Sequence, residues 1–212
     1  MSQDSIRPPA KGSSTLTAPS QDIWNEAKKW VRQQGLDPCS SRIVGKGSFG
    51  TVWPAQSRFN QLVVAVKFSR SFDEEAHEEE KKTLRVLSNR PHPNVVRILA
   101  HQAWEQPFWM SAQISELAFS DLQLWLHQHI VDVPAAFFFA KDIASGLSHL
   151  HSWEVEHRDL KPSNVLLYVV TAGCPRVQLR IGDFGSSRLS PLIRTSSSRR
   201  NKSRCVEPLL HN

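Results

Sequence analysis

The chain has 212 residues, of which 40% are hydrophobic, and its formal net charge is +6. This length and composition exclude a wholly disordered chain and allow one or two domains with a substantial core. Six of the basic residues and a single acid lie in residues 186–212, so most of the positive charge belongs to that segment. We interpret it as a solvated tail and expect no nucleic-acid partner, because neither interleaved aromatic residues nor a binding fold accompanies the charge.

Cysteine usage and apolar runs indicate the compartment. Cys39, Cys174 and Cys205 are widely spaced and match neither a disulfide framework nor a zinc-site pattern. No apolar run approaches the length of a membrane span, and the polar residues 1–20 lack the apolar core of a signal peptide. We predict an intracellular protein, in the cytoplasm or the nucleus, without a membrane partner.

Two segments precede the first predicted strands. Residues 1–21 are rich in Ser, Pro and Thr, which predicts a disordered leader. In residues 22–38 apolar side chains recur at helical spacing, which predicts an amphipathic helix that Gly35 ends. We expect its apolar face to pack on the domain that follows. A partner-binding helix is the alternative, because this face would present both Trp24 and Trp30.

A glycine-rich turn follows, in the sequence Gly45-Lys46-Gly47-Ser48-Phe49-Gly50. Glycines at this spacing let backbone N–H groups approach phosphate oxygens, which side chains would block. The same triplet also marks dinucleotide-binding folds and occurs in ordinary hairpin turns. Here Thr51-Val52-Trp53 continues as a strand rather than a helix, and a second β-branched strand ends at Lys67. This arrangement favours a phosphate-binding loop between two strands.

Residues 73–87 predict a helix that carries five glutamates. Glu80 has Leu84 and Leu87 at i+4 and i+7, which places it on the inward stripe of that helix. Glu79 is the alternative inward carboxylate, and the other acids are expected to face solvent.

Between residues 114 and 151 the sequence predicts the end of a strand and two helices. The sequence Ile114-Ser115-Glu116-Leu117-Ala118 ends a strand, and a short helix follows over residues 121–128. A longer helix begins at Pro134 and ends at His151. Its core face is defined by four apolar residues at i, i+4, i+8 and i+11, which are Phe139, Ile143, Leu147 and Leu150.

Two strings in the last third of the sequence are the most informative. They are His157-Arg158-Asp159-Leu160-Lys161-Pro162-Ser163-Asn164 and Asp183-Phe184-Gly185, with two predicted strands, 165–170 and 177–181, between them. They supply a base, a lysine and two metal ligands in the order that phosphoryl transfer requires. Together with the glycine loop and Lys67, they complete the protein kinase signature set. Over residues 41–189 the chain therefore resembles the eukaryotic protein kinase superfamily, in its serine/threonine branch.

This resemblance implies an α+β fold with two lobes. We expect a partial kinase domain at residues 39–189, with a β-rich N-lobe at 39–118 and an incomplete, helical upper C-lobe at 119–189. The Ala-Pro-Glu sequence that closes the activation segment in this family does not follow Gly185. Residues 190–212 are instead predicted to be a basic Ser/Arg-rich tail, whose Thr195 to Ser198 are candidates for a phosphate-dependent switch.

The resemblance also assigns chemical roles. Asp159 would orient the substrate hydroxyl and accept its proton, and Lys161 would meet the γ-phosphate. Lys67 would hold the α- and β-phosphates and pair with Glu80. Glu79 is the rival for this pairing because the connection to His92-Pro93-Asn94 is longer than the family's usual one. Asn164 and Asp183 would bind Mg²⁺, and the string Leu-Lys-Pro-Ser after Asp159 is typical of Ser/Thr kinases.

The predicted cofactors are ATP and Mg²⁺. The hinge of the family corresponds to residues 114–118, with Ser115 in the gatekeeper position. The residues that would contact ATP come from the glycine loop, the two walls of the adenine site and the hinge; they are Gly45, Lys46, Gly47, Ser48, Phe49, Gly50, Val52, Ala65, Lys67, Glu116, Ala118 and Leu166.

We therefore predict a serine/threonine protein kinase that acts on protein substrates, with an activity that the missing lower C-lobe impairs. A catalytically inactive ATP-binding or regulatory module is the first alternative. A truncated fragment of a larger kinase is the second. Either a protein partner covers the incomplete C-lobe or the chain is only marginally stable.

Overall fold

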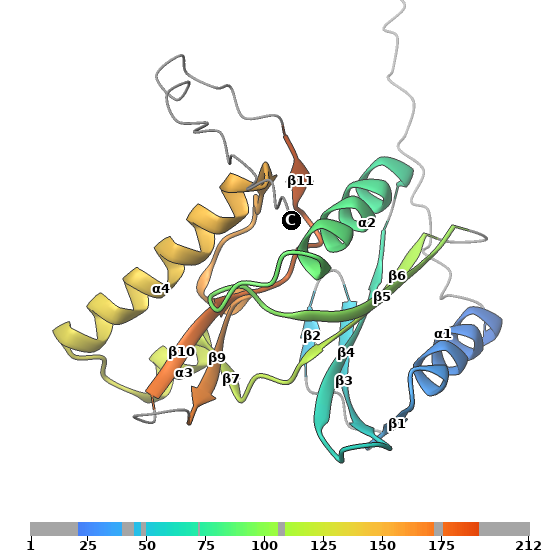
Figure 1. The fold of residues 1–212 in the computed structure, drawn as a ribbon, viewed down its shortest axis with the longest axis horizontal. Coiled ribbons are helices and arrows are strands. Elements are labelled where there is room, and N and C mark those ends of the chain that lie inside the picture. Colours follow the sequence, from blue (N-terminus) through green and yellow to red (C-terminus); the bar gives the residue numbers. More distant parts are fainter. Residues whose placement is uncertain are drawn as a thin grey trace, which may run out of the picture.

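The structure is a computed structural model that describes residues 21–39, 45–47, 50–71, 73–105, 109–171 and 176–190. Almost all of the predicted leader and tail, including Thr195 to Ser198, lies outside these residues. Figure 1 shows two lobes: a β-sheet with α1 and α2 beside it, and a second lobe in which α4 lies along a β-hairpin. This is the α+β, two-lobed arrangement that the sequence predicts. None of the described helices is long and apolar enough to cross a membrane.

The sheet of the first lobe has the strand order β1-β3-β4-β6-β5, with β2 paired to β3. All of these pairings are antiparallel. The predicted turn between two strands is present, because β2 and β3 flank it and β3 continues through Trp53. The strand bounds are β1 (Leu36–Pro38), β2 (Gly45–Gly47), β3 (Gly50–Ser57), β4 (Val63–Arg70), β5 (Ile98–Trp104) and β6 (Met110–Glu116).

The first helix, α1 (Gln21–Gln33), packs on the sheet through the apolar face that its spacing predicts. Ala27 and Val31 are buried in one core cluster with strand residues such as Val66. Trp30 meets Trp104 of β5 edge to face, with ring centroids 6.1 Å apart. Trp30 thus has an intramolecular partner in the sheet.

The second helix, α2 (Glu74–Ser88), begins where Asp73 caps it by accepting a hydrogen bond from the Ala76 amide at 2.7 Å. Its inward face carries Glu80, Leu84 and Leu87, as the spacing predicts. The same face also buries His77 and Thr83, which sequence analysis did not select. Among the described residues, the two ring nitrogens of His77 and the hydroxyl of Thr83 have no hydrogen-bond partner. The contact between α2 and the sheet is therefore unusually polar.

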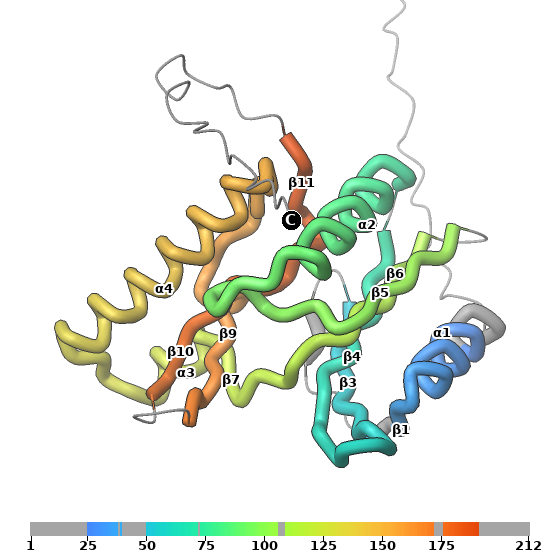
Figure 2. The backbone as a smooth tube through the Cα atoms, viewed as in Figure 1, coloured from blue at the N-terminus to red at the C-terminus, as the bar shows by residue number. Residues whose placement is uncertain are grey.

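The second lobe is organised by a hairpin. Its strands pair in antiparallel register from Val165 opposite Ile181 to Val170 opposite Arg176. The backbone trace in Figure 2 shows the hairpin between α4 and the sheet of the first lobe. The bounds in this lobe are β7 (Ser120–Asp121), α3 (Leu122–Gln128), α4 (Val133–Ser152), β8 (Val155–Glu156), a 3-10 turn (Pro162–Asn164), β9 (Val165–Val170), β10 (Arg176–Ile181) and β11 (Arg188–Leu189).

The helix α4 packs through one face only. The predicted core residues Ile143 and Leu150 belong to two neighbouring core clusters. Gly146 lies so close to the first lobe that an added Cβ would sit 2.5 Å from the Asn94 carbonyl oxygen. In contrast, Phe137 and Phe138 are 69% and 57% exposed. The helix therefore buries the predicted stripe and leaves a second apolar face in contact with solvent.

The buried histidine of α2 makes the stability of the first lobe depend on pH. Burial lowers the pKa of His77, against the opposing charges of Glu80 and Glu78. Below about pH 6.5 the unfolded state therefore binds more protons than the folded state. The free energy of unfolding keeps its full value above that pH and falls as the pH decreases. We expect His77→Leu to remove a large part of this loss.

Urea unfolding at several values between about pH 7.5 and about pH 5 measures this effect. The free energy of unfolding of His77→Leu should still fall somewhat as the pH decreases, because burial also lowers the pKa of His92 and His101. The exposed His127→Gln serves as the control for removal of a histidine. An identical pH dependence in wild type and His77→Leu would refute the prediction.

Candidate active site

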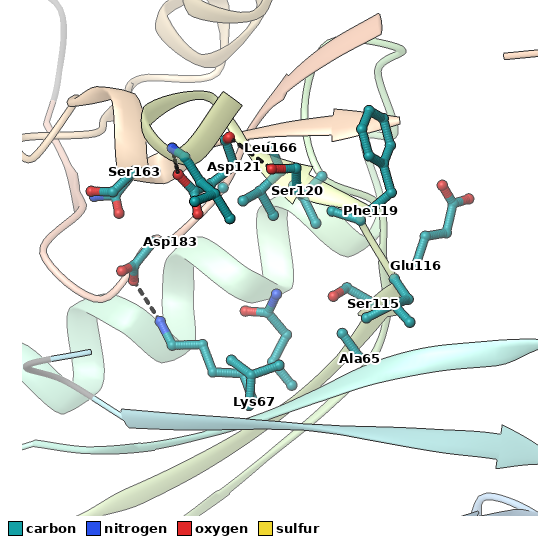
Figure 3. Close-up of a pocket in the computed structure, with 18 of the residues that line it drawn as sticks. Ala65, Lys67, Ser115, Glu116, Phe119, Ser120, Asp121, Ser163, Leu166 and Asp183 are labelled. Carbon is teal, nitrogen blue, oxygen red and sulfur yellow. Dashed lines mark hydrogen bonds and ion pairs between the residues drawn. The ribbon is translucent and has the colours of Figure 1, made fainter. Parts of the chain in front are cut away.

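A cavity of about 540 Å³ lies between the sheet and the hairpin of the second lobe. Figure 3 shows Ala65, Ser115 and Glu116 on its sheet side and Leu166 on the opposite side. The cavity brings together ten of the predicted site residues, which are Gly50, Val52, Ala65, Lys67, Glu116, Ala118, Lys161, Asn164, Leu166 and Asp183.

Other predicted residues lie away from this lining. Gly45, Lys46 and Gly47 form β2, the strand that precedes the turn. Ser48 and Phe49 lie outside the described residues. Asp159 does not line the cavity but is hydrogen-bonded to Lys161 and Asn164, which do. Glu80 is hydrogen-bonded to Ser111, which is not a lining residue.

The cavity also has lining residues outside the predicted catalytic, ATP-contacting and metal-binding set; two of them, Ser115 in the gatekeeper position and Leu117, belong to the predicted hinge. Gln113 and Ser115 alternate along β6, and both are buried. Their spacing of two residues indicates one face of a strand, but it does not show that this face lines a cavity. The further lining residues are Val96, Leu117, Phe119, Ser120, Asp121, Leu124, Ser163 and Gly182.

Lys67 reaches across the cavity to the second lobe. It lies on β4 between Val52 of β3 and Gln113 of β6. Its Nζ donates to Oδ1 of Asp183 at 2.5 Å, as the dashed line in Figure 3 shows. The Lys67 side chain is 15% exposed, so water screens this ion pair less than it would screen a surface pair. The predicted phosphate-binding lysine and the predicted metal-binding aspartate therefore neutralise each other.

The predicted ion pair between Lys67 and Glu80 is not formed in the structure, and this expectation was wrong. Oε2 of Glu80 instead accepts a hydrogen bond from the Ser111 hydroxyl at 2.9 Å, and both residues are buried. The rival Glu79 binds Lys82 at 2.8 Å and the Leu189 amide at 3.2 Å. Glu80 does lie on the inward face of α2, as predicted, but its carboxylate is bound by Ser111 of β6 and not by Lys67.

His157 joins the two informative strings of the sequence. Its Nε2 lies 2.8 Å from the carbonyl oxygen of Gly182, and its ring meets the ring of Phe184 edge to face at 5.4 Å. Phe184 is almost completely buried. Asp183, between these contacts, has a φ of 61°, a left-handed conformation that is uncommon for a residue other than glycine. The packing around His157 thus fixes the direction of the Asp183 side chain.

Asp159 is held by two donors from its own loop. Its Oδ2 accepts hydrogen bonds from Nζ of Lys161 at 2.7 Å and from Nδ2 of Asn164 at 3.1 Å. The hydrogen bond from Lys161 is the main cause that lowers the pKa of Asp159, and the one from Asn164 adds to it. Asp159 is therefore a carboxylate at neutral pH.

Asn164 and Asp183 lie next to each other at the end of the hairpin, where the Gly182 amide donates to the Asn164 carbonyl at 2.9 Å. Nδ2 of Asn164 is used by Asp159, which leaves its Oδ1 as a donor atom for a metal. An amide oxygen and a carboxylate are ligands that suit Mg²⁺. Among the described residues, no cluster of three or more His, Cys, Asp or Glu could hold a metal. The residues therefore fit a Mg²⁺ ion that is shared with phosphate oxygens.

The chain is similar to known protein kinases. Residues 40–207 match the family model described as "Protein kinase domain". "Serine/threonine-protein kinase VIK" of Arabidopsis thaliana is 34% identical over 73% of this chain and 35% of its own length. "Serine/threonine-protein kinase 1" of the same plant is 32% identical over 74% of the chain, and "Aurora kinase B" of Xenopus tropicalis is 27% identical over 72%. The chain spans only 18% and 41% of the lengths of these last two relatives.

The Ser111–Glu80 contact predicts a stability effect that no surface serine would show. Ser111→Ala leaves a buried carboxylate without its hydrogen bond, so we expect the free energy of unfolding to fall by about 1–3 kcal/mol. Ser69→Ala is the matched control, because Ser69 is the buried cross-strand neighbour of Ser111 and makes no hydrogen bond to Glu80. Urea unfolding of the two variants measures the difference, and equal losses would contradict the assignment.

Proposed function

The chain belongs to the protein kinase domain family, and we propose that it transfers the γ-phosphate of ATP to Ser or Thr hydroxyl groups of protein substrates. The observation that carries this proposal is the convergence of Lys67, Asp159, Lys161, Asn164 and Asp183 on one cavity or its edge. The relatives named above support the Ser/Thr specificity. The proposed compartment is the cytoplasm or the nucleus, supported by the exposed, free Cys39.

The residues of the site support a division of labour. Asp159, kept as a carboxylate by Lys161, would orient the acceptor hydroxyl and take its proton. Lys161 lines the cavity and would meet the γ-phosphate, while Lys67 would hold the α- and β-phosphates. Asn164 and Asp183 would hold Mg²⁺, which would neutralise charge that develops on the phosphate oxygens. Val52, Ala65 and Leu166 would enclose the adenine.

One observation favours the non-catalytic alternative. Catalysis in this family requires the strand lysine to pair with the helix glutamate and the Asp-Phe-Gly aspartate to hold metal. In this structure Lys67 binds Asp183 instead, and Glu80 binds Ser111. A module that binds nucleotide without transferring phosphate, or a piece of a longer kinase, would be compatible with these contacts.

Two measurements separate these functions. We expect MgATP, but not ATP with a chelator, to raise the midpoint of thermal unfolding of the wild type. Asp159→Asn should keep this rise and lower phosphate transfer to a generic basic protein by about 10²–10⁴-fold, because it removes the base. Asp132→Asn is the control, since Asp132 caps α4 and does not line the cavity.

No MgATP-dependent shift in a folded sample would refute the proposed function. A shift without transfer would select the non-catalytic alternative. Transfer that survives in Asp159→Asn would show that another base, or another kinase in the sample, is responsible.

We further propose that a protein partner covers the exposed apolar face at the start of α4. Ile130, Val133, Phe137 and Phe138 lie within nine consecutive residues, 130–138, and each is more than half exposed. Such a group of large apolar side chains marks an interaction surface. Double substitution of Phe137 and Phe138 by Lys should abolish binding of this partner.

The test uses the tagged chain to capture proteins from the cells of origin. It measures whether one protein is retained in a stoichiometric amount. The wild type and the control Leu62→Lys, which changes an exposed apolar residue of the first lobe, should retain it equally. The double variant should lose it. The same retained proteins in all three samples would contradict the proposal.

A further inference from the structure

Glu116, at the end of β6, is held by two side chains of the hairpin. The hydroxyl of Tyr168 donates to the backbone carbonyl of Glu116 at 3.1 Å. The guanidinium of Arg180 forms an ion pair with the Glu116 carboxylate. The same guanidinium lies 4.2 Å above the ring of Tyr168. Both the main chain and the side chain of Glu116 are therefore bound, and the two groups that bind it also bind each other.

This three-residue clamp is partly removed from water. Tyr168 is 7% exposed and belongs to the core cluster that contains Phe184. Burial raises the pKa of the Tyr168 phenol, so the hydroxyl stays protonated and remains a donor. Nε of Arg180 also donates to Oε1 of Gln178 at 3.3 Å. Because the surroundings of Tyr168 and Arg180 restrict both side chains, the clamp is organised before any ligand binds.

The clamp connects two halves of the cavity. Arg180 lies opposite Leu166 in the hairpin register, and Leu166 lines the cavity. Asn164 directly precedes β9, the strand of Leu166, and Asp183 lies two residues after the end of β10, the strand of Arg180. Glu116 lines the cavity from the other lobe. A hairpin that carries the proposed metal ligands thus also fixes a residue beside the proposed adenine site.

A carbonyl oxygen has two lone pairs, and Tyr168 uses one of them on Glu116. We infer that the other accepts from an N–H donor on a ligand, because Glu116 lines the cavity. The 6-amino group of adenine is such a donor, whereas the 6-oxo group of hypoxanthine is an acceptor that would face the carbonyl oxygen unfavourably. A carbonyl held in one orientation discriminates between these bases more strongly than a carbonyl that is free to turn.

We propose that Tyr168 and Arg180 are positioning residues that fix the Glu116 carbonyl and thereby determine the preference of the cavity for adenine. This inference rests on the proposed nucleotide-binding function and deepens it. The clamp acts on recognition of the base, while Lys67, Asn164 and Asp183 act on the phosphates. Loss of the clamp should therefore change base preference more than it changes affinity for the triphosphate.

Tyr168→Phe tests the clamp directly, because it removes the donor and keeps the ring under Arg180. Calorimetric titration of the full chain with MgATP and with Mg-inosine triphosphate gives two affinities, whose ratio reports base preference. We expect Tyr168→Phe to lower this ratio about five-fold through weaker ATP binding, the size of one hydrogen bond. Arg180→Gln should lower it in the same direction. Arg176→Gln, an exposed arginine of the same strand, should leave it unchanged.

The outcomes are distinguishable. Wild type that binds neither nucleotide refutes the proposed function, and the inference fails with it. Wild type that binds ATP, with an unchanged ratio in Tyr168→Phe and Arg180→Gln, refutes the clamp alone. Tighter ATP binding by Tyr168→Phe would show that Tyr168 competes for the carbonyl, which also overturns the inference. Thermal unfolding without nucleotide verifies that each variant is folded, and Arg180→Lys provides a milder variant if Arg180→Gln does not fold.

Discussion

The ion pair between Lys67 and Asp183 is the contact on which the arrangement of the site depends. It joins a strand of the first lobe to the loop that follows the hairpin of the second, across the cavity. Each partner is partly buried, so removal of one would leave the other charge in a partly dehydrated position. The pair keeps both groups in the cavity. When the proposed ligands bind, Lys67 would hold phosphate and Asp183 would hold the metal in place of this pairing.

The inward face of α2 buries polar side chains beside Leu84 and Leu87. Glu80 is bonded to Ser111, while His77 and Thr83 are buried without hydrogen-bond partners among the described residues. Unsatisfied buried polar groups cost stability, whereas an apolar replacement of similar shape does not carry this cost. The polar face therefore lowers the stability with which α2 is held in this position. It also makes the contact sensitive to protonation of a histidine.

The hairpin of the second lobe serves the site at three levels. Leu166 of β9 lies on the cavity wall, and the ends of the hairpin bring Asn164 and Asp183 together. Tyr168 of β9 and Arg180 of β10 bind Glu116 of the first lobe. Since one rigid element holds residues for the base and for the phosphates, the two parts of the nucleotide site are fixed relative to each other.

The sequence by itself determined the local elements and the identity of the chemical groups. The spacing of Glu80, Leu84 and Leu87 predicts a helix over residues 73–87, and the apolar runs 165–170 and 177–181 predict two strands joined by a turn. The motifs around Asp159 and Asp183 indicate the family because their spacing is short and specific. Tertiary structure alone decided which carboxylate Lys67 meets, because Asp183 is 116 positions away in the chain. It also decided the clamp on Glu116, since Arg180 is 64 positions away and no periodicity records such a distance. Pairings of this kind follow from how the lobes pack, and a local pattern carries no information about that packing.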